Sequence, residues 1–357
     1  MRKVSRNTPH YTSMKLSIIL VSYNSREDLA RCLPTIVGQE EGVEILVVDN
    51  SPGDDTRAWL VATYPEVRLI ANSENSGYAG GNNLGIEHAT GEWVLILNPD
   101  TQVHPGALTA LLSAAKQHDR ALLTPKLLKL NGKVNACGLE MHYTGITSCR
   151  GLGDDSGKYT GTFPAQAVSG AAFLAPKWLL IDLDGFETSY FMYQEDADLS
   201  LRARAKGYEI YCVADAVVTH AYSTDMSVNK FYLLERNRLL TLFRLYQSRT
   251  LFRLAGALLL TELAVLAFAL LKGPSYLARK GSGYIWLWRK RRDWLTGRRA
   301  FQQWRTMPDD DLLRGGTVVL PFDQLVSSRA RADLLTRATK PVYNLLRPRT
   351  AFKRARE

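Results

Sequence analysis

The chain has 357 residues, 46% of them hydrophobic, and a formal net charge of +10. At about 150 residues per domain, this length suits one large α/β core with an appended region. The cysteines have neither metal-ligand spacing nor the density of a disulfide-rich scaffold, so we expect reduced thiols at Cys32, Cys137, Cys149 and Cys212. The charged N-terminus runs into an apolar stretch, 17–21, that is too short for a signal peptide, so we expect no export signal and a cytoplasmic protein.

The charge is divided unevenly along the chain. Residues 1–220 hold 19 Lys and Arg against 25 Asp and Glu, whereas residues 221–357 hold 26 against 10. Carboxylates in the first part suit a site that binds a cation and needs a base. The basic second part requires an anionic partner, for which lipid and nucleic acid are the two candidates.

Short β-branched runs alternate with helical stretches from Lys15 to about Thr124, which predicts a parallel sheet with crossover helices. The predicted strands are 16–21, 44–49, 67–71, 93–97 and 121–124. Polar residues lie at the ends of four of these strands, at 22–24, 49–51, 72–75 and 98–100. Ligands of an open parallel sheet bind beyond the carboxyl ends of its strands, so we expect the four segments to converge on one site.

The next part, 126–165, is rich in glycine and turns, and we predict a β-hairpin excursion that shapes part of a pocket. A second ordered block follows. It comprises a strand at 171–175, an acidic segment at 193–198, a helix that stops at Lys206 before Gly207, and a strand that ends at His220.

The composition changes again in the last third of the chain. We predict a helix at 231–246, followed by the apolar run 251–271. The run is nearly long enough to cross a bilayer, but Arg253 and Glu262 would each be costly at membrane depth, so we predict that it lies in the interface. Alternating Trp and basic residues at 284–294 are typical of anchors at the level of lipid headgroups.

Two single carboxylates at predicted strand ends are candidates for chemistry. Asp49 can accept hydrogen bonds from a nucleobase or ribose, and the alternative is a plain turn through 49–53. Asp100 can provide the hard oxygen ligands that hold Mg²⁺ or Mn²⁺ together with substrate phosphates. The alternative for Asp100 is the N-cap of a helix that starts near Pro105.

The cluster Glu195, Asp196 and Asp198 is the third candidate. Asp198 can pair with Arg202 one helical turn later, and a first helical turn favours acids. These reasons do not explain Glu195 and Asp196, because adjacent carboxylates repel unless they hold a cation or share a proton. We therefore expect chemistry at these two residues.

Together these motifs resemble an inverting family 2 glycosyltransferase of the GT-A fold, in the branch that contains rhamnosyltransferases. The matching segments are SIILVSYNSREDLARCL, EILVVDNSPGDDT, NSENSGYAGGNNLGI, WVLILNPDTQV, SGAAFLAPK, YFMYQEDADLSLRARAKGY and VVTHAYS. They run in the family's order over residues 16–223. The resemblance implies an α/β fold with the Rossmann-like mixed sheet of GT-A nucleotide-diphospho-sugar transferases, followed by a C-terminal helical region.

The resemblance also implies a site for a nucleoside-diphosphate sugar. The implied donor-binding residues are Ser22, Tyr23, Asn24, Asp49, Asn75, Gly77, Gly81, Asn82 and Asn98. The first three would lie against the nucleoside, and the Asp49 carboxylate would recognise the base or ribose. The glycines would let the backbone approach the phosphates closely.

The metal and the base follow from the same resemblance. Asp100 would bind Mg²⁺ or Mn²⁺ with modest affinity, because Asn98 stands where many members carry a second Asp, and His220 stands where relatives supply another ligand. Asp196 would be the general base that deprotonates the acceptor hydroxyl, with Glu195 on the acceptor side. A single displacement would invert the anomeric configuration.

We therefore expect a flexible N-terminus at 1–14, a GT-A domain at 15–228 and a basic helical, membrane-associating region at 229–357. The expected reaction transfers a sugar to a glycan or polyprenyl-diphosphate-linked saccharide in cell-envelope polysaccharide synthesis. L-Rhamnose from dTDP-rhamnose is the first choice of donor, and UDP-sugars stay open. The expected location is the inner face of the cell membrane, on an anionic lipid surface and without nucleic acid.

Two alternatives stay open at this point. A nucleotidyltransferase would also bind a nucleotide and Mg²⁺ at the sheet edge, but it would need a basic phosphate-gripping loop that is absent near Ser22. A nucleic-acid-binding protein would use the basic tail to hold phosphates. The apolar run argues against the second alternative, because RNA binding does not need such a surface.

Overall fold

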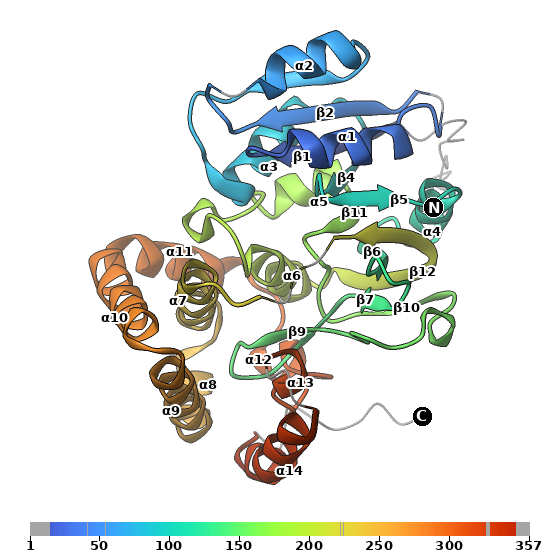
Figure 1. Ribbon diagram of the computed structural model, residues 1–357. Helices are drawn as coiled ribbons and strands as arrows, with labels where there is room; N and C mark the ends of the chain where they lie inside the picture. Colours follow the sequence, from blue (N-terminus) through green and yellow to red (C-terminus); the bar gives the residue numbers. More distant parts are fainter. Residues whose placement is uncertain are drawn as a thin grey trace, which may run out of the picture.

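The computed structural model describes residues 15–347, apart from 41, 54, 222, 224 and 326–328. The predicted flexible segment 1–14 lies outside the described residues. A large sheet flanked by helices occupies the upper part of the view in Figure 1, and a lobe of C-terminal helices lies below it.

Ten strands form one mixed sheet in the order β10-β12-β6-β11-β4-β1-β2-β3, with β5 paired to β12 and β7 paired to β6. The bounds are β1 Leu16–Ser22, β2 Glu44–Asp49, β3 Arg68–Ala71, β4 Trp93–Leu97, β5 Thr101–Val103, β6 Ala121–Leu128, β7 Val134–Ala136, β10 Thr162–Pro164, β11 Ala172–Pro176 and β12 Glu209–His220. Strands β3, β2, β1 and β4 are parallel, whereas β11 runs antiparallel to β4 and β6. The predicted strands are all present, and the carboxyl ends of β1, β2 and β4 share one edge.

The predicted excursion after β6 contains a separate two-stranded hairpin, formed by β8 (Leu139–Met141) and β9 (Thr147–Cys149). The two other short strands of this part, β7 and β10, join the main sheet instead of leaving it. The excursion therefore widens the sheet as well as covering it.

Fourteen α-helices are present in the described part of the chain. Their bounds are α1 Arg26–Cys32, α2 Thr56–Thr63, α3 Gly77–His88, α4 Ala107–Gln117, α5 Lys177–Asp182, α6 Glu195–Ala205, α7 Val228–Leu245, α8 Ser248–Arg253, α9 Ala255–Lys272, α10 Pro274–Arg289, α11 Arg291–Trp304, α12 Asp309–Leu312, α13 Phe322–Leu325 and α14 Arg329–Leu346. The predicted helix 231–246 corresponds to α7, and the apolar run corresponds mainly to α9. Helix α7 packs against α6, α10 and α11, so contacts cross the predicted domain boundary at residue 228.

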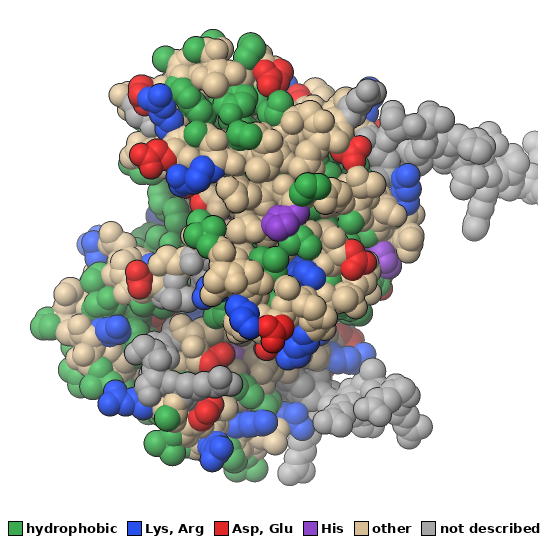
Figure 2. Space-filling view, turned by 45° about the vertical axis from the view of Figure 1, so that its right-hand side comes forward, with side chains coloured by type: hydrophobic (Ala, Val, Ile, Leu, Met, Phe, Trp, Pro, Cys, Tyr) green, Lys and Arg blue, Asp and Glu red, His purple; other side chains and the backbone are tan. Residues whose placement is uncertain are grey.

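The lobe of α7 to α11 presents a mixed surface. Hydrophobic side chains alternate there with Lys and Arg, at the lower left of the space-filling view (Figure 2). The four cysteines, Cys32, Cys137, Cys149 and Cys212, are free thiols, as predicted.

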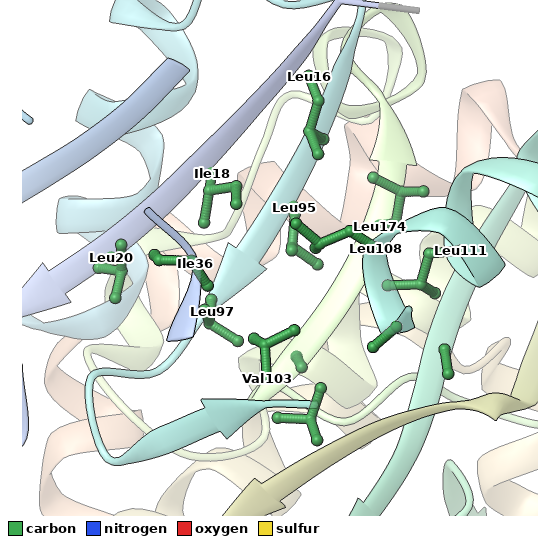
Figure 3. Packing of buried hydrophobic residues seen from close by; sticks show 14 of the residues in the cluster. Leu16, Ile18, Leu20, Ile36, Leu95, Leu97, Val103, Leu108, Leu111 and Leu174 are labelled. Carbon is green, nitrogen blue, oxygen red and sulfur yellow. The ribbon is translucent and has the colours of Figure 1, made fainter. Parts of the chain in front are cut away.

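Alternation along β1 builds two hydrophobic layers, one on each face of the sheet. Leu16, Ile18 and Leu20 belong to one layer with residues of α1 and α4, and in Figure 3 Leu108 of α4 lies beside Leu95 and Leu174 of that layer. Ile19 points to the opposite face, where it packs with α3, α5 and α6. Apolar layers cover both faces of the sheet, so the polar side chains of the central strands lie mainly at the strand ends. The candidate site is located there.

Candidate functional site

The carboxyl ends of β1, β2 and β4 bring polar residues together, as predicted from the sequence (Figure 1). In the parallel register, Ser22 is opposite Asp49, and Leu20 is opposite Leu97, the residue before Asn98. Ser22 is fully buried, and its hydroxyl has no hydrogen-bond partner among the described residues. A buried hydroxyl of this kind suits a position that contacts a ligand.

The turn after β1 is tied to the end of β2. Asn24 has a left-handed backbone, with φ of 51°, and its N–H donates to Ser51 Oγ at 2.6 Å. Asparagine tolerates this conformation better than most residues do. The ring of Tyr23 is 53% exposed beside this turn, where a flat ligand could stack on it.

Asp49 has a partner that the sequence analysis did not identify. Its buried carboxylate accepts a hydrogen bond from Arg57 Nε at 2.6 Å and another from the Ser51 N–H at 3.1 Å. Arg57 also donates to the Asn72 carbonyl at 2.7 Å, so it joins the ends of β2 and β3. The half-exposed guanidinium places a positive charge at the edge where a phosphorylated ligand is expected.

The start of α3 contacts the loop that precedes α6. Asn75 Oδ1 accepts a hydrogen bond from the Gly77 N–H at 2.9 Å. Gly77 has φ of +71°, and a Cβ at this position would lie 2.5 Å from the Phe191 carbonyl oxygen. Glycine is therefore required for this close approach, which links the predicted donor loop to the acid cluster.

Gly81 and Asn82 lie one turn further along α3. A Cβ on Gly81 would lie 2.6 Å from Val21 of β1, so this glycine allows the helix to pack closely on the sheet. Asn82 donates to the Tyr78 carbonyl at 2.9 Å, and its buried Oδ1 has no partner within the described part of the chain. Contact of either residue with a donor stays a prediction.

Asp100 and His220 come together through the pairing of β5 with β12. Thr101 is opposite His220 in this register, and His220 Nε2 lies 3.3 Å from Asp100 Oδ2. The other ring nitrogen, Nδ1, lies 2.9 Å from Asn135 Oδ1, which orients the imidazole. Asn98 shapes the same turn through its backbone, since its carbonyl accepts from Thr101 Oγ1 at 2.6 Å.

This pair fits a divalent cation when a substrate completes the coordination. Asp100 Oδ1 is buried and has no hydrogen-bond partner among the residues described. The described residues contain no cluster of three or more His, Cys, Asp or Glu side chains able to hold a metal ion. Mg²⁺ and Mn²⁺ commonly bind through one or two protein ligands plus phosphate oxygens, and two ligands are what this turn offers.

Glu195 and Asp196 form the first turn of α6. Asp196 Oδ2 accepts from the Gly170 N–H at 2.9 Å, and Oδ1 accepts from the Ala197 N–H at 2.8 Å. The Tyr78 hydroxyl donates to the Gly170 carbonyl, so α3 supports the residue that holds Asp196. Glu195 is buried, and its Oε2 has no partner in the described part.

Burial raises the pKa of both carboxyls. The pKa of Glu195 lies well above its usual range because the side chain is buried and the Asp196 carboxylate is adjacent. Burial also raises the pKa of Asp196, and hydrogen bonds from the Gly170 and Ala197 amides oppose this shift. A raised pKa makes a carboxylate a stronger base near neutral pH.

Tyr193 lies in the loop before α6. Burial raises its pKa, and the negative charges of Glu195 and then Asp100 raise it further. The backbone around it is strained, because Phe191, Tyr193 and Gln194 have φ of 64°, 67° and 69°. Non-glycine residues in such conformations persist only where neighbouring structure fixes them.

Helix α7 fixes this strained loop. The buried Asn237 side chain donates to the carbonyls of Tyr190, Met192 and Tyr193 at 3.0, 2.9 and 2.7 Å. Arg236 adds a hydrogen bond of 2.7 Å to the Tyr190 carbonyl. The sequence analysis assigned α7 to the tail and did not identify either residue.

Asp198 has the structural role expected for it. Its fully buried carboxylate accepts from Arg202 Nε at 2.6 Å, which confirms the predicted pair. Arg244 of α7 lies 3.2 Å away, and the Tyr190 hydroxyl donates at 3.0 Å. These bonds join α6 to α7 below the acid cluster.

The comparisons with known proteins identify the family of the chain. The family model described as Glycosyl transferase family 2 matches residues 17–170. The chain is 30% identical over 237 residues to the N-acetylglucosaminyl-diphospho-decaprenol L-rhamnosyltransferase of Mycobacterium tuberculosis, which covers 58% of this chain and 77% of that protein. It is 29% identical over 235 residues to the low-salt glycan biosynthesis hexosyltransferase Agl10 of Haloferax volcanii, covering 63% and 74%.

Among solved structures, the fold is similar to that of GalNAc-T7 with UDP, GalNAc and Mn²⁺, with a TM-score of 0.54. The sequences are 12% identical, and the match covers 66% of this chain and 49% of the other. This likeness concerns the fold alone.

Proposed function

The chain belongs to glycosyltransferase family 2 and has the GT-A fold, and from this we propose that it transfers a sugar from a nucleoside diphosphate to a polyprenyl-diphosphate-linked saccharide. The observation that carries the proposal is the convergence of three groups at one sheet edge. These are the strand ends with Asp49, the Asp100–His220 pair and the Glu195–Asp196 carboxylates.

The donor half of the site recognises a nucleotide in this proposal. Ser22 offers an unpaired hydroxyl, Asp49 offers carboxylate oxygens, and Tyr23 offers an exposed ring. Arg57 shares the Asp49 carboxylate and is placed to face a phosphate. No nucleotidyltransferase-type phosphate loop is needed for this mode of binding.

Asp100 and His220 would hold Mg²⁺ or Mn²⁺, with Asn135 fixing the orientation of the imidazole. The cation would supply charge stabilisation to the departing diphosphate. Its affinity would depend on the donor, because two protein ligands leave most of the coordination to phosphate oxygens and water.

Asp196 would act as the general base. The acceptor hydroxyl gives its proton to the Asp196 carboxylate, its oxygen bonds to the anomeric carbon, and the bond from that carbon to the diphosphate breaks. The two backbone hydrogen bonds from Gly170 and Ala197 hold the carboxylate in one orientation. One displacement of this kind inverts the anomeric configuration.

We assign the donor as dTDP-L-rhamnose and the pathway as cell-envelope polysaccharide synthesis. The support is the rhamnosyltransferase of Mycobacterium tuberculosis, whose name also specifies a diphospho-decaprenol acceptor. A screen of dTDP-, UDP- and GDP-sugars with Mn²⁺ and a lipid-diphosphate acceptor tests the assignment. Transfer of rhamnose with inversion, read by NMR of the product, is expected; selective transfer from a UDP-sugar would replace rhamnose, and absence of transfer from every donor would contradict the proposal.

The membrane partner is the second part of the proposal. Among the helices of the described part, α9 is the one long and apolar enough to cross a membrane. Its Glu262, however, lies 2.5 Å from Lys280 Nζ and 2.7 Å from Arg238, so one face of α9 is bonded to α10 and α7. On the side of α9 away from the buried Thr261, Leu259 and Leu263 are exposed. A helix held in this way would lie in the lipid interface, at the inner face of the cell membrane.

Charge complementarity favours an anionic lipid surface. The exposed Trp288 is followed by four cations at 289–292, and an exposed ring beside such charges suits lipid headgroups. Several other cations of the tail are paired inside the fold, including Arg238, Arg244 and Lys280. Fewer cations are therefore available to bind nucleic acid than the net charge of the tail suggests.

Flotation with phosphatidylglycerol vesicles tests the membrane assignment. The double variant Leu259→Glu/Leu263→Glu should lose flotation, whereas Val61→Glu, an exposed apolar position on α2, should keep it. Alkaline carbonate should release the wild type, since α9 does not span. Resistance to carbonate would show a spanning helix, and flotation of the double variant would place the anchor elsewhere.

A further inference from the structure

A groove lies between the start of α7 and α10, apart from the donor residues described above. Its volume is about 620 Å³, within the range of sites for small ligands. Its polar lining consists of Ser227, Asn229, Ser275, Arg279 and Ser282, and no carboxylate lines it. Hydroxyls, an amide and a guanidinium without a carboxylate suit an anionic ligand such as a phosphate.

Arg279 is held in position but keeps its charge available. Its guanidinium lies 5.5 Å from the centre of the Tyr232 ring, and Arg236 lies 5.4 Å from the same ring. No salt bridge joins Arg279 to any Asp or Glu that the structure describes. The groove walls are tied together, because the Tyr276 hydroxyl of α10 donates to the Met226 carbonyl at 2.6 Å.

The first turn of α7, which lines the groove, also approaches the loop before the acid cluster. Lys230 follows Asn229 directly, and its Nζ lies 5.8 Å from the centre of the Tyr193 ring. Tyr193 stands two residues before Glu195 in the strained loop. The start of α7, which forms one wall of the groove, therefore lies beside the loop that precedes the carboxylates assigned to deprotonation.

Another part of the groove lies near exposed apolar surface. Phe231 of α7 packs against Phe268 of α9 and Tyr276 of α10, with ring centres 5.8 and 5.4 Å apart. The C-terminal end of α9 is thus fixed beside the groove. Leu270 and Leu271 at this end are 67% and 88% exposed.

We propose that this groove binds the diphosphate of a lipid-linked acceptor through Arg279 and the neighbouring hydroxyls. The inference rests on the proposed function and adds the acceptor's position to it. An acceptor with one sugar on its diphosphate would place the sugar toward Tyr193 and Glu195 and the lipid chain along Leu270 and Leu271. Arg279 then selects a phosphorylated lipid over a neutral glycan.

Calorimetry on the full chain tests this proposal with farnesyl diphosphate, a soluble isoprenyl diphosphate. Arg279→Ala should weaken binding by about tenfold or more, the effect of losing one charge-assisted hydrogen bond. Arg279→Lys should recover part of the affinity. Arg299→Ala, which removes another exposed cation, on α11, is the matched control and should bind like the wild type. Binding of farnesol measures the contribution of the isoprenyl group, and binding of inorganic diphosphate measures that of the phosphates. Phosphatidylglycerol vesicles report binding to lipid headgroups.

The possible results distinguish an error in the groove proposal from an error in the proposed function. Unchanged farnesyl diphosphate affinity in Arg279→Ala, with thermal stability also unchanged, would overturn the groove and leave the glycosyltransferase assignment intact. Loss of vesicle binding alone in that variant would assign the groove to lipid headgroups and would also overturn the proposal. A wild type that binds no isoprenyl diphosphate but transfers sugar to a soluble glycan would instead contradict the lipid-linked acceptor.

Discussion

Replacing Asn237 with alanine removes the side chain that holds the strained loop in front of α6. The Asn237 amide donates to the carbonyls of Tyr190, Met192 and Tyr193, and Arg236 supports the first of these as well. The carbonyls of Met192 and Tyr193 thus lose a side-chain hydrogen-bond donor. These two hydrogen bonds are only partly buried, so water can reach the freed carbonyls and we expect a loss of about 1–3 kcal/mol in the free energy of unfolding.

Asn237→Ala should lower turnover more than it lowers the affinity for the donor. Each left-handed residue in the loop stores about 1–3 kcal/mol, so release of the support lets the loop relax and moves the start of α6. A displacement of about 1 Å at reacting groups costs roughly 10²-fold in rate. We therefore expect turnover of Asn237→Ala to fall by about 10²-fold, while donor affinity changes little, because Asp49 and Asp100 lie on other elements.

Turnover at saturating donor, donor affinity by calorimetry and the thermal midpoint should be measured together. Gln302→Ala is the matched control, since the Gln302 amide also donates to a backbone carbonyl, that of Leu245, at 2.9 Å. It should lose stability and keep turnover. If Asn237→Ala loses stability but retains turnover within about twofold, the loop does not position the base and the reasoning is wrong.

Three further predictions concern the carboxylates. Asp100→Asn should abolish Mn²⁺-dependent donor binding in calorimetry without lowering the thermal midpoint, and unchanged metal dependence would refute the cation assignment. Asp196→Asn should lower transfer by roughly 10²- to 10⁴-fold at nearly constant donor affinity. Asp198→Asn should lose more stability and less activity, because Asp198 bonds buried arginines. Equal losses of activity and stability in the two variants would contradict this division of roles. Glu195→Gln should raise the thermal midpoint at pH 7–8, because the raised pKa of Glu195 makes its charge destabilising once the pH exceeds the ordinary value of 4.5, and the gain should vanish below that pH.

The strands and the position of the site could be predicted because they follow from short-range patterns. Residues that alternate between the two faces of β1, such as Ile18 and Ile19, define a strand buried on both sides, and a parallel arrangement brings the strand ends to one edge. The helical pair of Asp198 and Arg202 is likewise local, and it is confirmed at 2.6 Å.

Tertiary partners could not be predicted, because no local pattern specifies them. Arg57 reaches Asp49 across the β2–α2 turn, and Tyr78 supports Asp196 only through Gly170, which comes from another part of the chain. Gly81 is a residue that was identified from the sequence but for which the structure offers a second explanation. The sequence placed it beside a phosphate, but a glycine on a helix can equally serve close packing, and the contact with β1 supplies that reason.

Asn237 was overlooked because it lies among the cations of a helix interpreted as a membrane-associating tail. A signal was nevertheless present, since the polar residues Asn237, Thr241 and Arg244 share one helical face, one and two turns apart. Such a stripe within a helix predicts buried hydrogen bonding. It does not predict which loop receives the bonds.

Helix α7 connects the loop before α6 to helices α9 and α10 through side-chain bonds on two of its sides. On one side it holds the loop before α6 through Asn237. On the other side Glu235 and Arg238 bond Lys280 of α10 and Glu262 of α9 in a largely buried network. Removing one partner of a buried ion pair leaves an uncompensated charge and is strongly destabilising, so this joint is rigid rather than adjustable. A truncation at residue 228 would therefore abolish activity along with membrane binding, and only substitutions on the outer face of α9 separate the two. Under the proposed function, the same network would hold the acid cluster at a fixed distance from the lipid-contacting face of α9, as a base acting on a membrane-anchored acceptor would require.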